Sequence, residues 1–187
     1  MTNSKYEAGA LNVDQMLAPN SATFEIPPFQ RRYAWGVEEV GELLGDLYED
    51  GNWMGSRSDT EPYFLGSIVL AKNEKGSYLI LDGQQRLTTI SLLLAVLQHS
   101  LQDNGSEIRK YLECGSFGKR KSPKIRLQPE DVETFEDLLN NPTCWSDPSR
   151  RRENISKSVQ KIIEIVEEHV TNANKRGIKI LSMVFIY

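Results

Sequence analysis

Residues 78–101 read YLILDGQQRLTTISLLLAVLQHSL, and this stretch decides the fold. Its first four residues, Tyr78 to Leu81, are apolar enough to predict a buried strand. From Leu87 to Leu101, apolar residues lie on nearly every side of the expected helix, which predicts burial on several faces. The turn between strand and helix contains Gly83, whose missing side chain lets the backbone come close to a ligand.

The turn Asp82–Arg86 places free backbone N–H groups at the N-terminus of the helix, where the helix dipole favours an anion such as phosphate. Arg86 falls in the first helical turn, where a positive charge opposes the dipole at a cost of roughly 0.3–1 kcal/mol. A bound phosphate would remove this cost and accept hydrogen bonds from the guanidinium group. We therefore predict an anion site at this turn. Its further polar side chains are Gln84, Gln85, Thr88 and Thr89.

Asp82 and Gln85 also fit a second interpretation, because an acid three residues before a glutamine is typical of a capping box. In a capping box each side chain bonds the backbone N–H of the other residue, and no ligand is needed. This interpretation leaves Arg86 without an explanation. The residues alone favour the anion site and keep the capping box open.

A second segment, Phe29–Gly36, reads FQRRYAWG and follows a double proline that ends the preceding strand. In one interpretation, Tyr33 and Trp35 lie in the core while the arginines stay in solvent. In the other, the segment is a second wall of the anion pocket, with Arg31 or Arg32 facing a phosphate and an aromatic ring near a base. Spacing alone leaves both interpretations open.

Outside these two segments, the pattern predicts an α+β domain with a small mixed sheet and the helix 87–101 buried behind it. Residues 1–10 are expected to form a disordered tail, residues 11–102 the core, and residues 103–187 a mainly helical, incomplete extension. Leu11 is expected to point inward from a short helix at 11–17. Further helices are expected at 37–48, 129–139 and 149–172, strands at 22–26, 63–70, 124–128 and 178–187, and a lid-like loop at 51–62. A polar turn at 72–76 is expected to join the strands 63–70 and 78–81 into a hairpin.

The amino-acid composition argues against several classes of protein. The net charge of −4 and the pI of about 5.3 argue against a dedicated DNA-binding domain, and the basic runs at 119–126 and 150–152 are expected to be solvated, with local DNA contact as the alternative. No apolar run approaches the roughly 20 residues of a membrane-spanning helix, and the N-terminus lacks the apolar stretch of a secretory leader, so the cytoplasm is the expected location. The isolated residues Cys114, Cys144, His99 and His169 predict neither a disulfide framework nor a metal site.

Three blocks of sequence, IPPFQRRYAW at 26–35, YFLGSI at 63–68 and LDGQQRLTT at 81–89, together resemble the N-terminal domain of GmrSD-type modification-dependent restriction proteins. The resemblance covers residues 11–100 and implies a fold similar to ParB and sulfiredoxin, in which a strand–turn–helix holds nucleotide phosphates. It also implies a bacterial defence role, in which binding and hydrolysis of nucleoside triphosphates control the cleavage of modified phage DNA.

Carried over by position, the resemblance implies catalytic roles for Asp82 and Arg86. Asp82 would hold Mg²⁺ through water or orient the attacking water, and Arg86 would stabilise charge on the phosphates. The nucleotide would be GTP or ATP and would bring the magnesium ion with it, so no residue is expected to ligate a metal directly. The implied nucleotide-binding residues are Gln30, Arg31, Arg32, Tyr33, Gly83, Gln84, Gln85, Thr88 and Thr89.

Many relatives carry a C-terminal HNH nuclease domain, and nothing in this sequence matches it. We therefore expect no nuclease site here, and contact with DNA only indirectly or through a missing region. Two alternatives stay open: a module that senses a nucleotide or a modified base without turnover, and a truncated regulatory partner of a full-length relative. The second alternative follows from the apolar end VFIY at 184–187, which self-association would shield from solvent.

Overall fold

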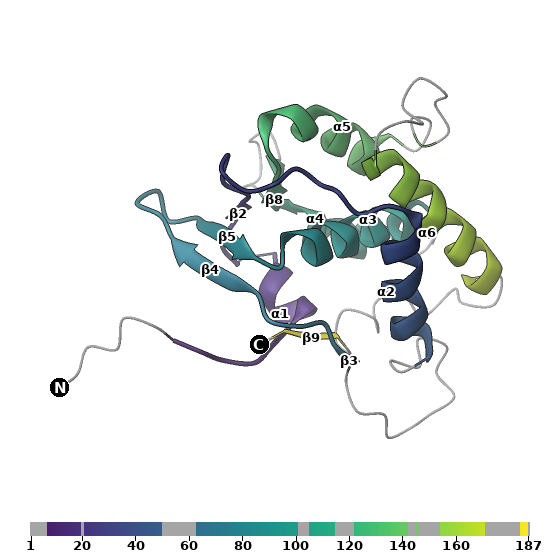
Figure 1. Cartoon of the computed structure of the whole chain (residues 1–187), viewed down its shortest axis with the longest axis horizontal. Helices are drawn as coiled ribbons and strands as arrows, with labels where there is room; N and C mark the ends of the chain where they lie inside the picture. Colours follow the sequence, from purple (N-terminus) through teal and green to yellow (C-terminus); the bar gives the residue numbers. More distant parts are fainter. Residues whose placement is uncertain are drawn as a thin grey trace.

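The computed structural model describes residues 7–19, 21–49, 63–100, 105–114, 122–141, 145, 154–170 and 184–186. Six helices are described in these ranges: α1 Val13–Leu17, α2 Val37–Glu49, α3 Gln84–Ser100, α4 Gly105–Leu112, α5 Pro129–Asn140 and α6 Asn154–Val170. The strands described are β1 Leu11–Asn12, β2 Phe24–Glu25, β3 Tyr63–Phe64, β4 Val69–Lys72, β5 Tyr78–Asp82, β6 Glu113–Cys114, β7 Ser122–Pro123, β8 Ile125–Arg126 and β9 Val184–Ile186. The predicted α+β class is confirmed (Figure 1).

The main sheet has four strands in the order β4-β5-β2-β8. The hairpin β4–β5 is antiparallel, as the polar turn between the two strands predicted, whereas β5, β2 and β8 run parallel. Because parallel strands end at the same edge of a sheet, the segments that follow β5, β2 and β8 emerge side by side. This edge therefore brings together the turn at Gly83, the loop after Glu25 and the residues after Arg126.

One face of the main sheet is buried by helices and the other is open. Phe24, Ile80 and Ile125 point to the buried face and are at most 4% exposed, while their neighbours Leu81 and Arg126 are exposed. This alternation follows from the two-residue period of a strand. Figure 1 shows the hairpin β4–β5 on one side of the molecule, α3 in the middle, α2 and α6 on the other side, and α5 along the top.

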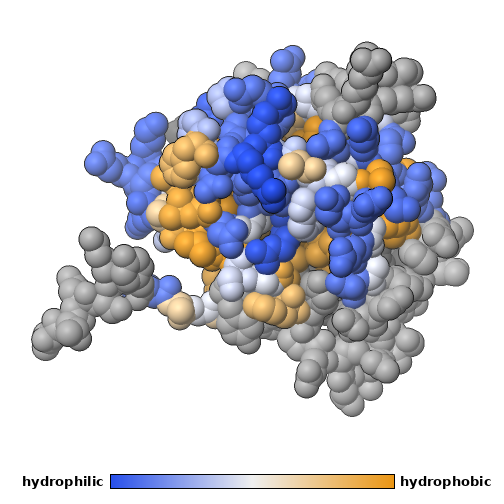
Figure 2. All heavy atoms as spheres, in the orientation of Figure 1, coloured by the Kyte–Doolittle hydropathy of each residue, from blue (hydrophilic) through white to orange (hydrophobic). Residues whose placement is uncertain are grey.

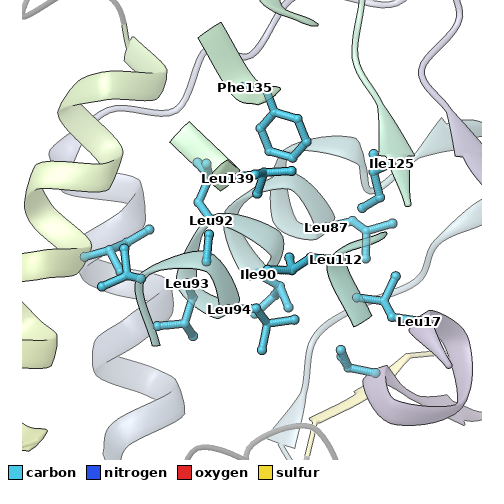
Figure 3. Close-up of a cluster of buried hydrophobic side chains, with 14 of the residues drawn as sticks. Leu17, Leu87, Ile90, Leu92, Leu93, Leu94, Leu112, Ile125, Phe135 and Leu139 are labelled. Carbon is cyan, nitrogen blue, oxygen red and sulfur yellow. The ribbon is translucent and has the colours of Figure 1, made fainter. Parts of the chain in front are cut away.

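Helix α3 lies at the centre of the core. It is buried from Leu87 through Leu97 on all sides, which confirms the helix predicted from its apolar surface, and it begins at Gln84, three residues earlier than expected. Figure 3 shows its side chains meeting those of other elements, including Leu17 of α1, Phe135 of α5 and Ile125 of β8. The cluster continues across residue 103 into α4, α5 and α6, and the division of the chain at that residue stays a prediction.

Three local predictions were wrong. Leu11 lies in β1 and is 46% exposed, because α1 begins only at Val13, after an Asn12–Gln15 capping box. The strand expected at 63–70 is divided into β3 and β4, because Gly66 adopts φ 102° and interrupts the ladder. Lys124, counted with a solvated basic run, is 1% exposed, and its ammonium group donates to the carbonyls of residues 18 and 21 at 2.8 and 2.9 Å. Burial lowers the pKa of Lys124.

Strand β9 lies between β1 and β3 in a second, three-stranded sheet. Its residues pair antiparallel with Leu11–Asn12 and parallel with Tyr63–Phe64, so backbone partners cover both of its edges. Self-association through this segment stays a prediction. The lid expected at 51–62 and residues 1–6 of the tail expected at 1–10 lie outside the described residues. None of the helices described here has the length and apolar character needed to cross a membrane.

Candidate functional site

The predicted anion site lies where β5 turns into α3. Gly83 adopts φ 85°, which side chains rarely allow, and an added Cβ would lie 2.8 Å from Ile68 Cγ1 and 3.2 Å from the Ser67 carbonyl oxygen. Only glycine fits there without a shift of its neighbours. The Leu87 N–H donates to the Gly83 carbonyl at 3.1 Å, so the N–H groups that precede it at the start of α3 have no partner within the helix. These groups are the donors that an anion would use.

The two glutamines after Gly83 hold the loop that follows β2. We name residues 27–36 the partner loop. Gln85 Oε1 accepts hydrogen bonds from the backbone N–H groups of Ala34 and Trp35, at 2.8 and 3.2 Å, and Gln85 Nε2 donates to the Arg32 carbonyl at 3.1 Å. Gln84 Nε2 donates to the carbonyl of residue 31 at 3.0 Å. The side chain of Gln85 is therefore used by the partner loop, and tertiary contacts replace the capping box.

Arg86 also bonds to protein atoms. Its guanidinium group donates to the carbonyl oxygens of Leu65 and Ser67 at 2.7 and 3.0 Å, and so holds the segment between β3 and β4. Gly66 allows this contact, because a Cβ at that position would lie 1.6 Å from one guanidinium nitrogen. The unfavourable position of Arg86 in the helix dipole is thus offset by two carbonyl dipoles. A role of Arg86 toward phosphate stays a prediction.

The two arginines of the partner loop have different surroundings. Arg32 forms an ion pair with Asp131, whose side chain is 8% exposed, and Asp131 Oδ2 accepts the Tyr33 N–H at 3.2 Å. Arg31 is exposed and forms no salt bridge with any described residue. The Gly36 N–H, and more weakly the Arg31 charge, lower the pKa of Glu39. Of the two arginines, Arg31 is the one available to an anion.

Tyr33 and Trp35 belong to the core side of the partner loop. The Tyr33 hydroxyl lies 2.8 Å from Thr89 Oγ1 and donates to Ser158 Oγ at 3.1 Å, and burial raises its pKa. Trp35 packs against the hydrophobic core, and its carbonyl accepts from Ser158 at 3.1 Å. Thr89 also donates to the Gln85 carbonyl at 2.9 Å. These contacts hold the partner loop on α3 and α6.

Two oxygens in the first two turns of α3 have no partner. Among the described residues, three buried side-chain atoms lack a hydrogen bond: Gln84 Oε1 and Thr88 Oγ1 in α3, and Ser156 Oγ in α6. A buried polar atom left unpaired costs roughly 1–3 kcal/mol, so such atoms usually bond an ordered water or a ligand. Gln84 and Thr88 both belong to the predicted nucleotide-binding set.

Asp82 is exposed at the end of β5, beside Val69 of β4. No cluster of three or more His, Cys, Asp or Glu residues that could hold a metal is present in the part of the chain that the structure describes. Magnesium often binds through one or two carboxylates together with substrate phosphates and keeps several waters. A single carboxylate at the rim of the turn fits that mode.

Residues far along the chain complete the contacts of the partner loop, and no local sequence pattern indicates them. The buried Gln128, just after β8, donates to the Pro27 carbonyl at 3.4 Å and also to the Gln30 carbonyl. Asp131 holds Arg32, and Asn154 Nδ2 donates to the carbonyl of residue 34 at 3.1 Å. The local sequence gives no sign of this role, because the helix dipole by itself favours acids in the first turn of α5.

The fold and the site together define an α+β module in which the strand–turn–helix motif β5–α3 holds two neighbouring loops in place by hydrogen bonds. The sequence matches the family described as GmrSD restriction endonuclease, N-terminal domain, over residues 13–187. The chain belongs to this family, which confirms the resemblance drawn from the three sequence blocks and gives the chain a role in a restriction system. No curated protein matches the sequence.

Proposed function

We propose that this domain binds a nucleoside triphosphate at the N-terminus of α3 and hydrolyses it to regulate DNA cleavage by a restriction system. The observation that carries the proposal is the start of α3, where donors that lack helical partners follow Gly83 and two buried oxygens, Gln84 Oε1 and Thr88 Oγ1, have no hydrogen bond. An anion with attached water would satisfy both kinds of group. The family adds a restriction context to this chemistry.

In this proposal the phosphates accept hydrogen bonds from the first N–H groups of α3, and Thr88 donates to a phosphate oxygen or an ordered water. Arg31 approaches from the partner loop and neutralises phosphate charge. Asp82, at the rim, binds the hydrated magnesium ion that accompanies the nucleotide, or orients the attacking water. Three parallel strands end at this edge, which is consistent with a strand–turn–helix that holds nucleotide phosphates in the ParB-like manner.

The partner loop offers a route from nucleotide to nuclease. It contacts α3 through Gln85, α5 through Asp131 and α6 through Asn154. A ligand bound between Arg31 and α3 would favour one arrangement of these contacts over another. Because restriction acts on DNA inside the bacterial cell, we place the domain in the cytoplasm, with DNA contacted through another part of the system.

The test is binding and hydrolysis of the four NTPs with magnesium, for the wild type and for Arg31→Ala and Asp82→Asn. We expect Arg31→Ala to weaken binding by about tenfold, equivalent to about 1.4 kcal/mol, and Asp82→Asn mainly to slow phosphate release. The matched control is Lys110→Ala, which removes an exposed cation of α4 and should change neither quantity. Failure of the wild type to bind any NTP would refute the proposal. Binding without phosphate release would refute hydrolysis and favour the sensing module.

A further inference from the structure

Phe29 is an exposed aromatic side chain at the apex of the partner loop. It is 76% exposed, the largest value among the large hydrophobic residues that the structure describes as exposed. The Gln30 N–H donates to the Pro27 carbonyl at 3.0 Å and closes a tight turn with Phe29 inside it. Single exposed apolar residues are common on protein surfaces, so exposure alone assigns no role.

The turn that carries Phe29 is held from both sides. Gln128, only 4% exposed, donates its amide to the carbonyls of Pro27 and Gln30. On the other side, Gln30 Nε2 donates to the Leu81 carbonyl at 2.9 Å. The buried amide of Gln128 thus fixes the backbone of a turn whose apex faces solvent, and a turn that is already ordered loses little conformational entropy when a ligand binds to it.

Hydrogen bonds on both sides of Phe29 also place its turn relative to the β5–α3 turn. Leu81 precedes Gly83 by two residues, a reach of roughly 7 Å of extended chain, and Arg31, two residues after Phe29, bonds to Gln84 through its carbonyl. The turn that carries Phe29 therefore lies beside the β5–α3 turn of the proposed phosphate site. Val69 and Leu81 are also exposed, at 47% and 37%, and Figure 2 shows apolar residues over the hairpin next to a strongly hydrophilic strip.

We propose that the ring of Phe29 is the surface on which the nucleobase stacks while the phosphates bind at the start of α3. This inference rests on the proposed function. Tyr33 and Trp35, the aromatic residues first considered for this role, are directed into the core. Stacking of a base on an aromatic side chain is worth about 1–3 kcal/mol and tolerates every base. The site therefore binds all four NTPs with similar affinity.

The experiment compares magnesium complexes of NTPs with inorganic tripolyphosphate, which has phosphates but no base. Phe29→Ala should weaken NTP binding about 5- to 150-fold and leave tripolyphosphate binding unchanged, while Phe29→Trp should keep NTP affinity. Leu11→Ala, which trims another exposed apolar side chain in β1, is the matched control. Circular dichroism confirms that each variant is folded.

Three results would overturn the inference. If Phe29→Ala binds NTP like the wild type, the base does not stack on this ring. If Phe29→Ala loses tripolyphosphate as strongly as NTP, the residue acts by shaping the turn. If the wild type binds tripolyphosphate as tightly as NTP, the base makes no contact while the phosphate site stands. Binding of neither ligand by the wild type refutes the proposed function as well.

Discussion

Replacement of Arg86 by alanine tests whether this residue holds the fold. The substitution removes the two hydrogen bonds to the carbonyls of Leu65 and Ser67, at 2.7 and 3.0 Å, and leaves the segment around Gly66 without its partner. Hydrogen bonds to a charged group contribute about 1.5–3 kcal/mol each, and the partial exposure of Arg86 favours the lower end. Removal of a positive charge from the helix N-terminus returns roughly 0.3–1 kcal/mol. We expect the free energy of unfolding to fall by about 2–3 kcal/mol.

The assay is urea unfolding followed by circular dichroism and tryptophan fluorescence, for the wild type, Arg86→Ala and Arg86→Lys. Arg86→Lys should lose about half as much stability, because one ammonium group cannot reproduce the geometry of two guanidinium donors. Lys110→Ala provides the control for loss of an exposed cation. If Arg86→Ala is as stable as the wild type, or more stable through relief of the dipole, the contacts with the two carbonyls do not hold this segment.

This result also decides how nucleotide measurements on Arg86 are interpreted. If Arg86→Ala is destabilised, lost binding in that variant reports the position of the β3–β4 segment as well as any phosphate contact. Binding measured under conditions where the variant is fully folded separates the two effects. A folded Arg86→Ala protein that still releases phosphate from NTP at the wild-type rate would refute a catalytic role of Arg86.

Asp131→Asn should lower the free energy of unfolding by about 1 kcal/mol, because it weakens the bond to a partly exposed Arg32 and keeps an oxygen for the Tyr33 N–H. Glu130→Gln, at the exposed neighbouring position, is the control in the same urea series, and an equal loss there would contradict the assignment. Burial, and secondarily the Asp14 carboxylate, raises the pKa of Tyr111 to about 12. Because the pKa of the Tyr111 hydroxyl is higher in the folded than in the unfolded state, the difference stabilises the folded state. This contribution is complete below about pH 10 and is lost as the pH rises from 10 to 12. Tyr111→Phe should make the fall of the urea midpoint shallower between these values, and an unchanged fall would contradict it.

Elements defined by local pattern were predicted from the sequence. The hairpin β4–β5, the buried helix α3 and the helices α2 and α5 follow from apolar spacing, from the polar turn and from the breakers at their ends. Gly83 was identified as the special position of the β5–α3 turn, and the structure gives it a positive φ. These features depend on neighbouring residues, so periodicity and turn chemistry are sufficient to find them.

The partners of the motif side chains could not be predicted. Gln85 fitted a capping box with Asp82 three residues away, yet it bonds the partner loop about 50 positions earlier in the chain. Asp131 meets Arg32 across a separation of 99 residues. Lys124 looked solvated within a basic run, and its carbonyl partners lie more than 100 residues away. No local pattern records such pairs.

The sequence by itself determined the strand, the glycine turn and the helix that places unpaired N–H groups at one point, because each depends on residues close together in the chain. Only the tertiary structure decided which motif side chains hold loops and which remain for a ligand. The parallel order of β5, β2 and β8 brings three distant segments to one edge, where Gln85 and Arg32 find protein partners while Arg31 and Phe29 stay exposed. Arg86 finds its partners in the segment between β3 and β4. The physical reason is that a hydrogen bond depends on the distance between two atoms in space, which sequence separation does not record.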